Sequence, residues 1–151
     1  NLQLAGKFQP DALLQQATEY LGWDRVNYLG YLHRHAISKY LQNSRIGLLL
    51  LQPIAGHLES YPIKLFEYMA AGLPVIASDF PVWRDIIEKY QCGILLDPND
   101  TQSIANSIEY LITHPDEAEA MGKNGQRACE KLFNWNSEAE KLVNTYLQLE
   151  R

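Results

Sequence analysis

Two glutamates separated by eight positions are the residues of this chain best placed to do chemistry. Glu59 follows an apolar run that ends near Leu51, and Glu67 closes the segment Glu59-Ser60-Tyr61-Pro62-Ile63-Lys64-Leu65-Phe66-Glu67. An ionised carboxylate accepts hydrogen bonds through two oxygens, so it can hold two adjacent hydroxyl groups. A pair of carboxylates can also act as acid and base on a glycosidic bond. The spacing therefore indicates a site for a hydroxyl-rich ligand.

Apolar runs and helical patterns alternate along the chain. The runs predict strands at Leu2–Ala5, Val26–Leu29, Ile46–Leu51, Pro74–Ala77 and Gly93–Leu96. Helical patterns fill the gaps, and further helices follow the turn at residues 97–100, the pair His114-Pro115, and either Asn136 or Ser137. Alternation of this kind predicts an α/β fold with a parallel sheet flanked by helices. We expect a single domain, because 151 residues can bury one core and no linker interrupts them.

These elements place both glutamates at one end of the sheet. A helix from about Pro62 to Ala71 leaves Glu59 in a loop and puts Glu67 little more than one turn into the helix. Ligands of open parallel sheets bind beyond the carboxyl ends of the strands, where loops enter helix N-termini. If Pro62 is the first helical residue, the backbone N–H groups of Ile63, Lys64 and Leu65 are unpaired and attract an anion. The Lys64 ammonium is a further candidate for a phosphate contact.

Each of these residues also has an ordinary structural interpretation. A glutamate near a helix start favours the helix dipole, a loop glutamate is commonly solvated, and Lys64 can be a surface lysine. His33 and His35 would face different sides of a helix, which argues against a shared metal. His57, two positions before Glu59, can touch a ligand, although loop histidines are mostly structural. No two aspartates stand one residue apart as a metal-diphosphate anchor, so no metal is expected.

Charge and composition exclude several classes of protein. The net charge is −5, but residues 25–64 hold five bases and one acid, so this region suits a small polyanion. Without a Lys/Arg stripe or a known nucleic-acid motif, we expect no nucleic-acid partner. No apolar run approaches the roughly 20 residues of a membrane span. Cys92 and Cys129 lack metal-ligand spacing, and we expect free thiols in a reducing compartment, hence a cytoplasmic protein.

The segment from Glu59 to Ser78 closely resembles the signature of glycosyl transferases group 1, glycosyltransferase family 4. Supporting matches are residues 26–32, residues 93–98 and Phe133-Asn134-Trp135. The resemblance implies a retaining, metal-independent GT-B enzyme with two Rossmann-like domains. The C-terminal domain would hold mainly the donor and the N-terminal domain the acceptor. This chain, residues 1–151, would be one partial C-terminal domain, with the N-terminal acceptor domain absent.

The resemblance also implies roles for individual residues. By position, Glu67 resembles the family's ribose ligand, and Glu59 resembles the residue that contacts donor-sugar hydroxyls near the reacting carbon, which makes it our catalytic candidate. The loop Gly30-Tyr31-Leu32 resembles the one whose backbone meets the nucleobase, and Ile63, Lys64 and Leu65 complete the expected nucleotide-sugar site.

The implied substrates are a nucleotide-diphosphate sugar and a saccharide or lipid-linked acceptor, with no cofactor. The implied process is hexose transfer in bacterial cell-surface polysaccharide assembly. Peripheral association of the intact enzyme with a membrane stays open.

The sequence departs from the family pattern in two places. Pro62 stands where members often have glycine, which removes one N–H from the loop. The chain also begins, at Asn1, with what resembles the second strand of the domain. There is no initiator methionine or signal peptide, so we expect the cut end of a longer protein. The first strand and helix, and the Arg and Lys that clamp the diphosphate, are then expected to be missing, and the fragment alone to be inactive.

A missing first strand has a structural consequence. In the strand order 3-2-1-4-5-6 that strand is central, so we expect a gap, a repaired sheet or a borrowed partner. The strands Leu2–Ala5 and Val26–Leu29 should still pair with each other.

Two other functions stay open on the sequence alone. Glycoside hydrolysis by the carboxylate pair is one, although the sequence context argues against it. A nucleotide-sugar-binding or assembly module without turnover is the other, and it fits a chain that lacks an acceptor domain. The sequence does not identify the nucleobase, the sugar or the acceptor.

Overall fold

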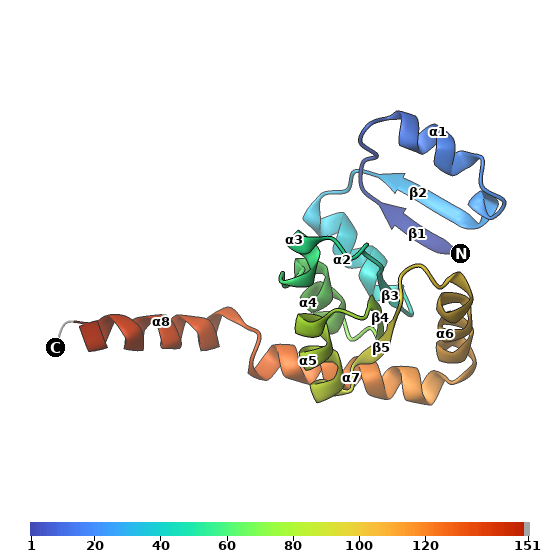
Figure 1. Cartoon of the computed structure of the whole chain (residues 1–151). Helices are drawn as coiled ribbons and strands as arrows, with labels where there is room; N and C mark the ends of the chain where they lie inside the picture. The colour runs from blue at the N-terminus through green and yellow to red at the C-terminus, as the bar shows by residue number, and fades with distance from the viewer. Residues whose placement is uncertain (150–151) are drawn as a thin grey trace. The chain divides into compact units, whose positions relative to one another are not determined.

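The computed structural model describes residues 1–149, which form two compact units, Asn1–Asn43 and a second that begins at Ser44. Figure 1 shows the elements of both units. In chain order they are β1 (Leu2–Ala5), α1 (Ala12–Thr18), the 3₁₀ turn η1 (Trp23–Arg25), β2 (Val26–Gly30), α2 (Arg34–Gln42), β3 (Gly47–Leu49), α3 (Ala55–Leu58), α4 (Ile63–Ala70), β4 (Val75–Ser78), α5 (Pro81–Tyr90), β5 (Gly93–Leu96), α6 (Thr101–Thr113), α7 (Pro115–Lys131) and α8 (Trp135–Leu149). That the whole chain is one partial domain stays a prediction.

The first unit is built on a parallel pair of strands. β1 pairs with β2 in the register Leu2 to Val26 and Leu4 to Tyr28, which confirms the predicted pairing. The Asn27 amide donates a 2.7 Å hydrogen bond to the Gln3 side-chain oxygen across the two strands. Parallel strands need a long crossover connection, and α1 and η1 supply it here.

Aromatic side chains supply the main packing of the first unit. The rings of Phe8 and Tyr28 meet edge to face at 5.4 Å between centroids, and Trp23 lies 6.3 Å from Tyr28. The Tyr28 hydroxyl donates to the carbonyl oxygen of Gly6 at 3.1 Å. No residue among the first 43 is fully buried, so this unit has a thin core.

The second unit contains a three-stranded parallel sheet in the order β3-β4-β5. Gly47 is paired with Val75, and Val75 with Gly93. The strands therefore form two separate sheets among the described residues, so of the expected outcomes the sheet is not repaired into one. β3 is shorter than the run Ile46–Leu51 predicts, because the backbone of Leu51 bonds to a side chain of β4 instead of its backbone.

Helices cover both faces of this sheet. Along β4, Val75 and Ala77 face one core cluster and Ile76 faces another, because neighbouring strand residues point to opposite faces. The first cluster is completed by α4, α5 and the end of α7, and the second by α6 and the start of α7. Buried members from these helices are Leu65, Met69, Trp83, Ile86, Ile87, Leu111, Ala118, Ala128 and Cys129. Both faces of β4 are thus removed from water.

The end of α4 is fixed by two glycines. Gly72 has φ +73°, and the Leu73 and Gly72 N–H groups donate 3.0 Å bonds to the carbonyl oxygens of Tyr68 and Met69. This pairing is the Schellman arrangement, which ends the helix at Gly72 as the sequence predicts. Gly122 of α7 packs so closely on this turn that a Cβ there would overlap the Gly72 carbonyl oxygen.

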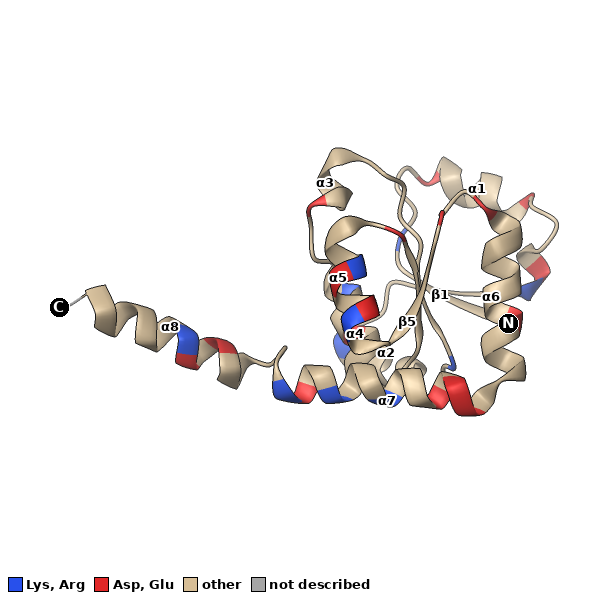
Figure 2. Ribbon diagram, turned by 60° about the horizontal axis from the view of Figure 1, so that its bottom comes forward, with Lys and Arg blue, Asp and Glu red and all other residues tan. Residues whose placement is uncertain are grey.

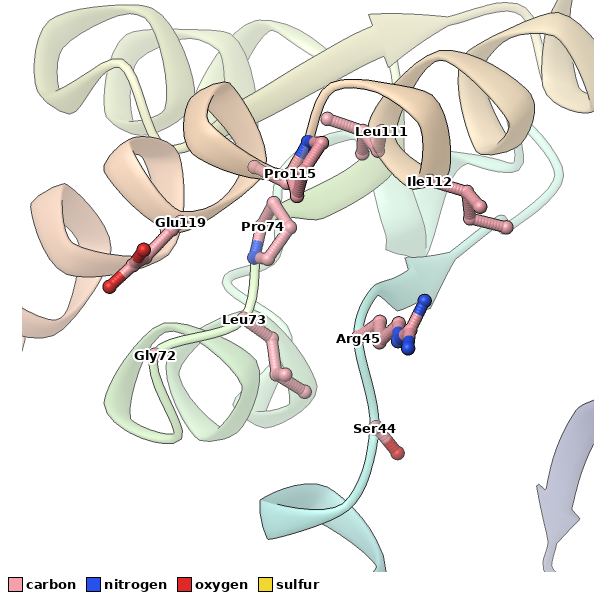
Figure 3. A pocket seen from close by; sticks show the side chains of 10 residues that line it. Ser44, Arg45, Gly72, Leu73, Pro74, Leu111, Ile112, Pro115 and Glu119 are labelled. Atoms are coloured by element: carbon pink, nitrogen blue, oxygen red, sulfur yellow. The ribbon is translucent and has the colours of Figure 1, made fainter.

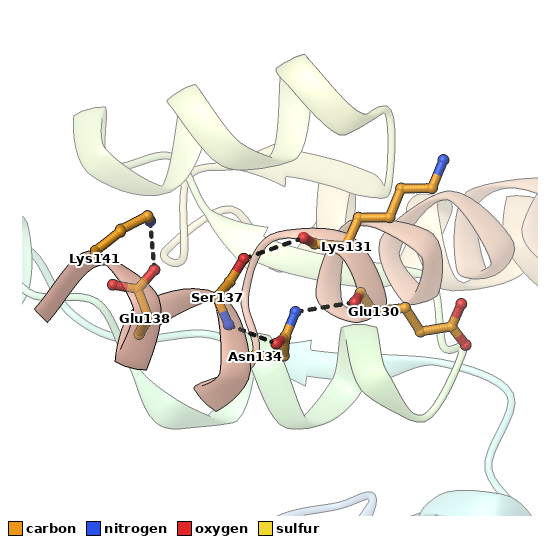
Figure 4. A network of polar contacts seen from close by, with 6 residues as sticks. All are labelled: Glu130, Lys131, Asn134, Ser137, Glu138 and Lys141. Carbon is orange, nitrogen blue, oxygen red and sulfur yellow. Dashed lines mark hydrogen bonds and ion pairs between the residues drawn. The ribbon is translucent and has the colours of Figure 1, made fainter. Parts of the chain in front are cut away.

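The connection between α7 and α8 is held by polar contacts (Figure 4). The Asn134 amide donates to the Glu130 carbonyl oxygen at 2.9 Å, and its oxygen accepts the Ser137 backbone N–H at 3.0 Å. Asn134 is therefore the cap of the last helix. The predicted cap at Asn136 or Ser137 is wrong, because the observed cap, Asn134, lies ahead of both.

Charged residues lie on the helices and loops of the second unit, and β3, β4 and β5 carry none (Figure 2). No helix among residues 1–149 is both long and apolar enough to cross a bilayer.

Gly122→Ala tests the contact between α7 and the end of α4. We expect the free energy of unfolding to fall by about 1–3 kcal/mol, because the added methyl group has no room beside the Gly72 carbonyl. Urea unfolding followed by circular dichroism measures the change. Gly56→Ala is the control, since a Cβ at Gly56 meets nothing within 4 Å. A stability of Gly122→Ala equal to that of the control would contradict the packing described.

Candidate functional site

Both candidate glutamates follow the carboxyl end of β3. The chain leaves β3 at Leu49, forms the short helix α3, and enters α4 at Ile63. Glu59 is the residue immediately after α3, and Glu67 lies in the second turn of α4. The predicted placement, one glutamate in a loop and one in a helix, is confirmed, whereas α3 was not predicted.

The Glu59 carboxylate is exposed and makes no hydrogen bond or ion pair among the described residues. An exposed and unpaired carboxylate is available to a ligand without first breaking an internal contact. Exposure alone is also what a solvated loop glutamate shows, so the position of the loop decides its role.

Glu67 forms an ion pair with Lys64 one turn earlier. The Lys64 ammonium donates to Oε2 of Glu67 at 2.7 Å, and the side chains are 52% and 36% exposed. An exposed pair of this kind contributes about 0–1 kcal/mol, so a ligand can separate the two groups at little cost. The arrangement offers a cation for a phosphate and a carboxylate for hydroxyls within one turn of α4.

The first turn of α4 differs from the prediction in one respect. Pro62 is the N-cap and not the first helical residue, with φ −73° and ψ 130°. The backbone N–H groups of Ile63 and Lys64 have no partner among the described residues. The N–H of Leu65, however, donates a 3.0 Å bond to the Pro62 carbonyl oxygen. The expectation of a free Leu65 N–H is wrong, because the first turn of α4 is closed by this bond between residues three positions apart.

The connection between β3 and α4, which carries Glu59, is hydrogen-bonded to β4 near its start and to α5 near its end. Near its start, the Ser78 hydroxyl donates to the Leu51 carbonyl oxygen at 2.8 Å and accepts the Leu51 N–H at 2.9 Å. Near its end, Nε1 of Trp83 donates to the Ser60 carbonyl oxygen at 2.7 Å. Ser78 and Trp83 are fully buried. Local sequence patterns reveal neither tie, because Ser78 and Trp83 lie 27 and 23 positions from their partners.

His57 bonds within the connection itself. Its Nδ1 lies 2.8 Å from the Gln52 carbonyl oxygen, which makes this nitrogen the donor. This bond closes the turn that contains α3, and it gives His57 the structural role that loop histidines mostly have.

An arginine that pairs with the residue after β4 and a tyrosine of α4 have raised pKa values. Asp79 directly follows β4, and its carboxylate accepts 2.8 Å and 2.5 Å bonds from Arg84, which raise the pKa of the guanidinium. Burial raises the pKa of Tyr68, and the nearby Lys64 charge lowers it in part. Asp79 and Arg84 were not singled out from the sequence, although a carboxylate at a strand end is the signal that could have found them.

The residues Gly30, Tyr31 and Leu32 belong to the first unit. Gly30 ends β2 with φ +62°, a conformation that favours glycine, and its carbonyl oxygen accepts the Gly6 N–H at 2.8 Å. The Tyr31 ring is 64% exposed, with the Lys7 ammonium 5.4 Å from its centroid. The structure brings Glu59, Ile63, Lys64, Leu65 and Glu67 together on one connection. That the Gly30-Tyr31-Leu32 loop faces them stays a prediction.

A surface cavity of about 550 Å³ lies elsewhere in the second unit (Figure 3). Arg45 and Pro74, which line it, precede β3 and β4, whereas Glu59 follows the opposite end of β3. This cavity therefore includes neither Glu59 nor Glu67. No group of His, Cys, Asp and Glu side chains that could hold a metal ion occurs among residues 1–149.

Comparison with known proteins decides the family. The model of the family described as glycosyl transferases group 1 matches residues 1–128. The chain belongs to this family. It is 25% identical over 147 residues to an MMP alpha-(1->4)-mannosyltransferase of Mycolicibacterium hassiacum, which covers 96% of this chain and 34% of the relative. The chain thus spans about a third of the length of that group 1 relative.

Solved glycosyltransferase structures share the fold. Sucrose-phosphate synthase from Thermosynechococcus elongatus superposes with a TM-score of 0.83 at 27% identity, over 98% of this chain and 38% of the other. HepE from Anabaena, solved in complex with UDP, gives 0.81 at 22% identity, over 97% and 40%. The predicted α/β fold of a GT-B C-terminal domain is confirmed.

Ser78→Ala tests the tie at the start of the connection. We expect the free energy of unfolding to fall by about 1–3 kcal/mol, because the Leu51 N–H and C=O lose their partner. Chemical unfolding of this variant is compared with that of Ser107→Ala on α6, whose hydroxyl makes no hydrogen bond to any described residue. Equal effects of the two substitutions would show that the tie contributes nothing.

Proposed function

We propose that this chain is the donor-binding part of a retaining glycosyltransferase of the hexosyltransferase type. The whole enzyme transfers a sugar from a nucleotide-diphosphate sugar to a saccharide or lipid-linked acceptor. One observation carries the proposal: two unpaired backbone amides, a cation and a carboxylate all lie in the first turns of α4. Family membership supports the same reaction class.

Each group has a chemical counterpart in the proposed donor. The Glu67 carboxylate accepts hydrogen bonds from the two ribose hydroxyls, which match its two oxygens. The N–H groups of Ile63 and Lys64 and the Lys64 ammonium meet the diphosphate, since a helix start favours negative charge. HepE, a protein of the same fold, is solved with UDP, which supports a nucleoside diphosphate as the ligand.

Glu59 acts on the donor sugar. Its free carboxylate orients the sugar hydroxyls and stabilises the positive charge that develops at the anomeric carbon as the bond to the diphosphate lengthens. The departing diphosphate gains negative charge, which the amides and Lys64 stabilise. The family resemblance implies these groups in place of a metal. The Gly30-Tyr31-Leu32 loop contacts the nucleobase through its backbone.

The acceptor binds to a part of the whole protein outside this chain, because the chain spans about a third of the relative described above. Assembly of cell-surface polysaccharide, with the enzyme in the cytoplasm, is the process we propose. A module that binds the donor without turnover is the alternative, and the same experiments separate the two.

Glu67→Gln and Glu59→Ala, made in the whole enzyme, separate binding from catalysis. We expect Glu67→Gln to weaken nucleoside diphosphate binding by about 10–100-fold, because hydrogen bonds to a charged group are lost. Glu59→Ala should bind within about 3-fold of the wild type but lose about 100-fold or more in kcat.

Calorimetry with UDP, GDP and ADP measures binding, and a transfer assay measures turnover. Glu109→Gln on α6 is the control, because that exposed side chain makes no hydrogen bond or ion pair among residues 1–149. Near wild-type transfer by Glu59→Ala refutes the catalytic role. Binding without any transfer in the wild type would favour the module.

Lys64→Met tests the phosphate contact separately. We expect about 10-fold weaker binding of nucleoside diphosphates, because one charge-assisted contact is lost, and unchanged binding of the nucleosides. Lys123→Met is the matched control, since Lys123 pairs with Glu119 on α7 as Lys64 pairs with Glu67 on α4. Equal loss of nucleoside and diphosphate binding would place Lys64 away from the phosphates.

A further inference from the structure

The Ser60 carbonyl has a single and deeply placed partner. Nε1 of Trp83 donates to it at 2.7 Å, and the Trp83 side chain is 0% exposed. The indole packs against Phe80, with 4.6 Å between ring centroids, inside the main core cluster of the second unit. The indole N–H of Trp83 is therefore held as rigidly as the core that surrounds it.

This bond is the polar tie between the Glu59 segment and the rest of the protein, and Leu58 of the same segment adds an apolar contact with the main core cluster. Residues 52–61 make several short-range bonds, such as His57 to Gln52 and Ser60 to His57. Among residues 1–149, the Trp83 bond is the one hydrogen bond that joins residues 52–61 to an element outside the connection. Ser78 holds the connection one residue earlier, at Leu51.

The position of the bond bears directly on Glu59. Ser60 follows Glu59 in the chain, so a fixed Ser60 carbonyl limits the directions in which the Glu59 side chain can leave the backbone. A loop without such a tie samples many conformations and rarely presents a carboxylate correctly. An indole N–H is a donor only, and burying it unpaired is costly, so the core favours the bonded state of the loop.

We propose that Trp83 is a positioning residue for Glu59, acting through the hydrogen bond to the Ser60 carbonyl. The inference rests on the proposed function, because it concerns how the catalytic candidate is held. Trp83 does not touch the donor. It holds Glu59 where its carboxylate orients the donor sugar and stabilises positive charge at the anomeric carbon, while donor binding by Glu67 and the first turn of α4 is independent of it.

Trp83→Phe in the whole enzyme removes the indole N–H that bonds to Ser60 and keeps an aromatic residue in the core. Release of nucleoside diphosphate from UDP-glucose, GDP-mannose or ADP-glucose, with water as the acceptor, is the assay. We expect kcat to fall by about 10-fold or more, as for other losses of orientation, while donor KM stays within about 3-fold. Ile87→Val, a buried substitution on the same helix without a polar contact, controls for loss of packing and should leave kcat within about 2-fold.

A double-mutant cycle separates positioning from general damage. If Trp83 acts through Glu59, Trp83→Phe lowers kcat in the wild type but causes no further loss in the Glu59→Ala background. An equal loss in both backgrounds, or no loss in either, overturns the inference. Failure of the proposed function looks different: the wild type then releases no nucleoside diphosphate from any donor, or Glu59→Ala retains full activity.

Discussion

The hydrogen bond between the Trp83 indole and the Ser60 carbonyl is the constraint on which the candidate site depends. The connection between β3 and α4 has little regular structure of its own, and its one helix has four residues. A segment of this kind takes its shape from contacts with rigid neighbours. β4 and α5 provide them, with Ser78 at one end and Trp83 at the other. Burial of β4 on both faces therefore has a functional consequence, because the same core that stabilises the fold holds the loop that presents Glu59.

Helix α4 joins stability to function in a similar way. Its C-terminal end is closed by Gly72 and lies against Gly122 of α7, where a larger side chain has no space. Its buried side, at Leu65 and Met69, belongs to the main core cluster. Its N-terminal end makes few contacts, with two unpaired amides and a weak ion pair. Tight packing of the C-terminal end fixes the position of α4. The polar groups at its N-terminal end can therefore stay free to bind a ligand.

Much of this architecture is predictable from the sequence, because it follows from local patterns. The strands at residues 2–5 and 93–96 have the predicted bounds, since short apolar runs flanked by turn residues mark them clearly. The prediction is less accurate where tertiary contacts decide. The cap of α4 falls at Pro62, and its carbonyl oxygen accepts the Leu65 N–H three residues later. The short helix α3 exists only as part of a folded connection. Trp83 reads as a core residue, but its partner is 23 positions away, and no local pattern contains that information.

We propose above all that the groups at the start of α4 and in the preceding loop bind a nucleotide-sugar. A crystal structure of the whole enzyme with a nucleoside diphosphate bound tests it most directly. We expect both Glu67 carboxylate oxygens within about 3 Å of the two ribose hydroxyls, and the Ile63 and Lys64 backbone nitrogens within about 3 Å of diphosphate oxygens. A nucleotide bound away from α4, with the Lys64–Glu67 ion pair unchanged, would contradict it.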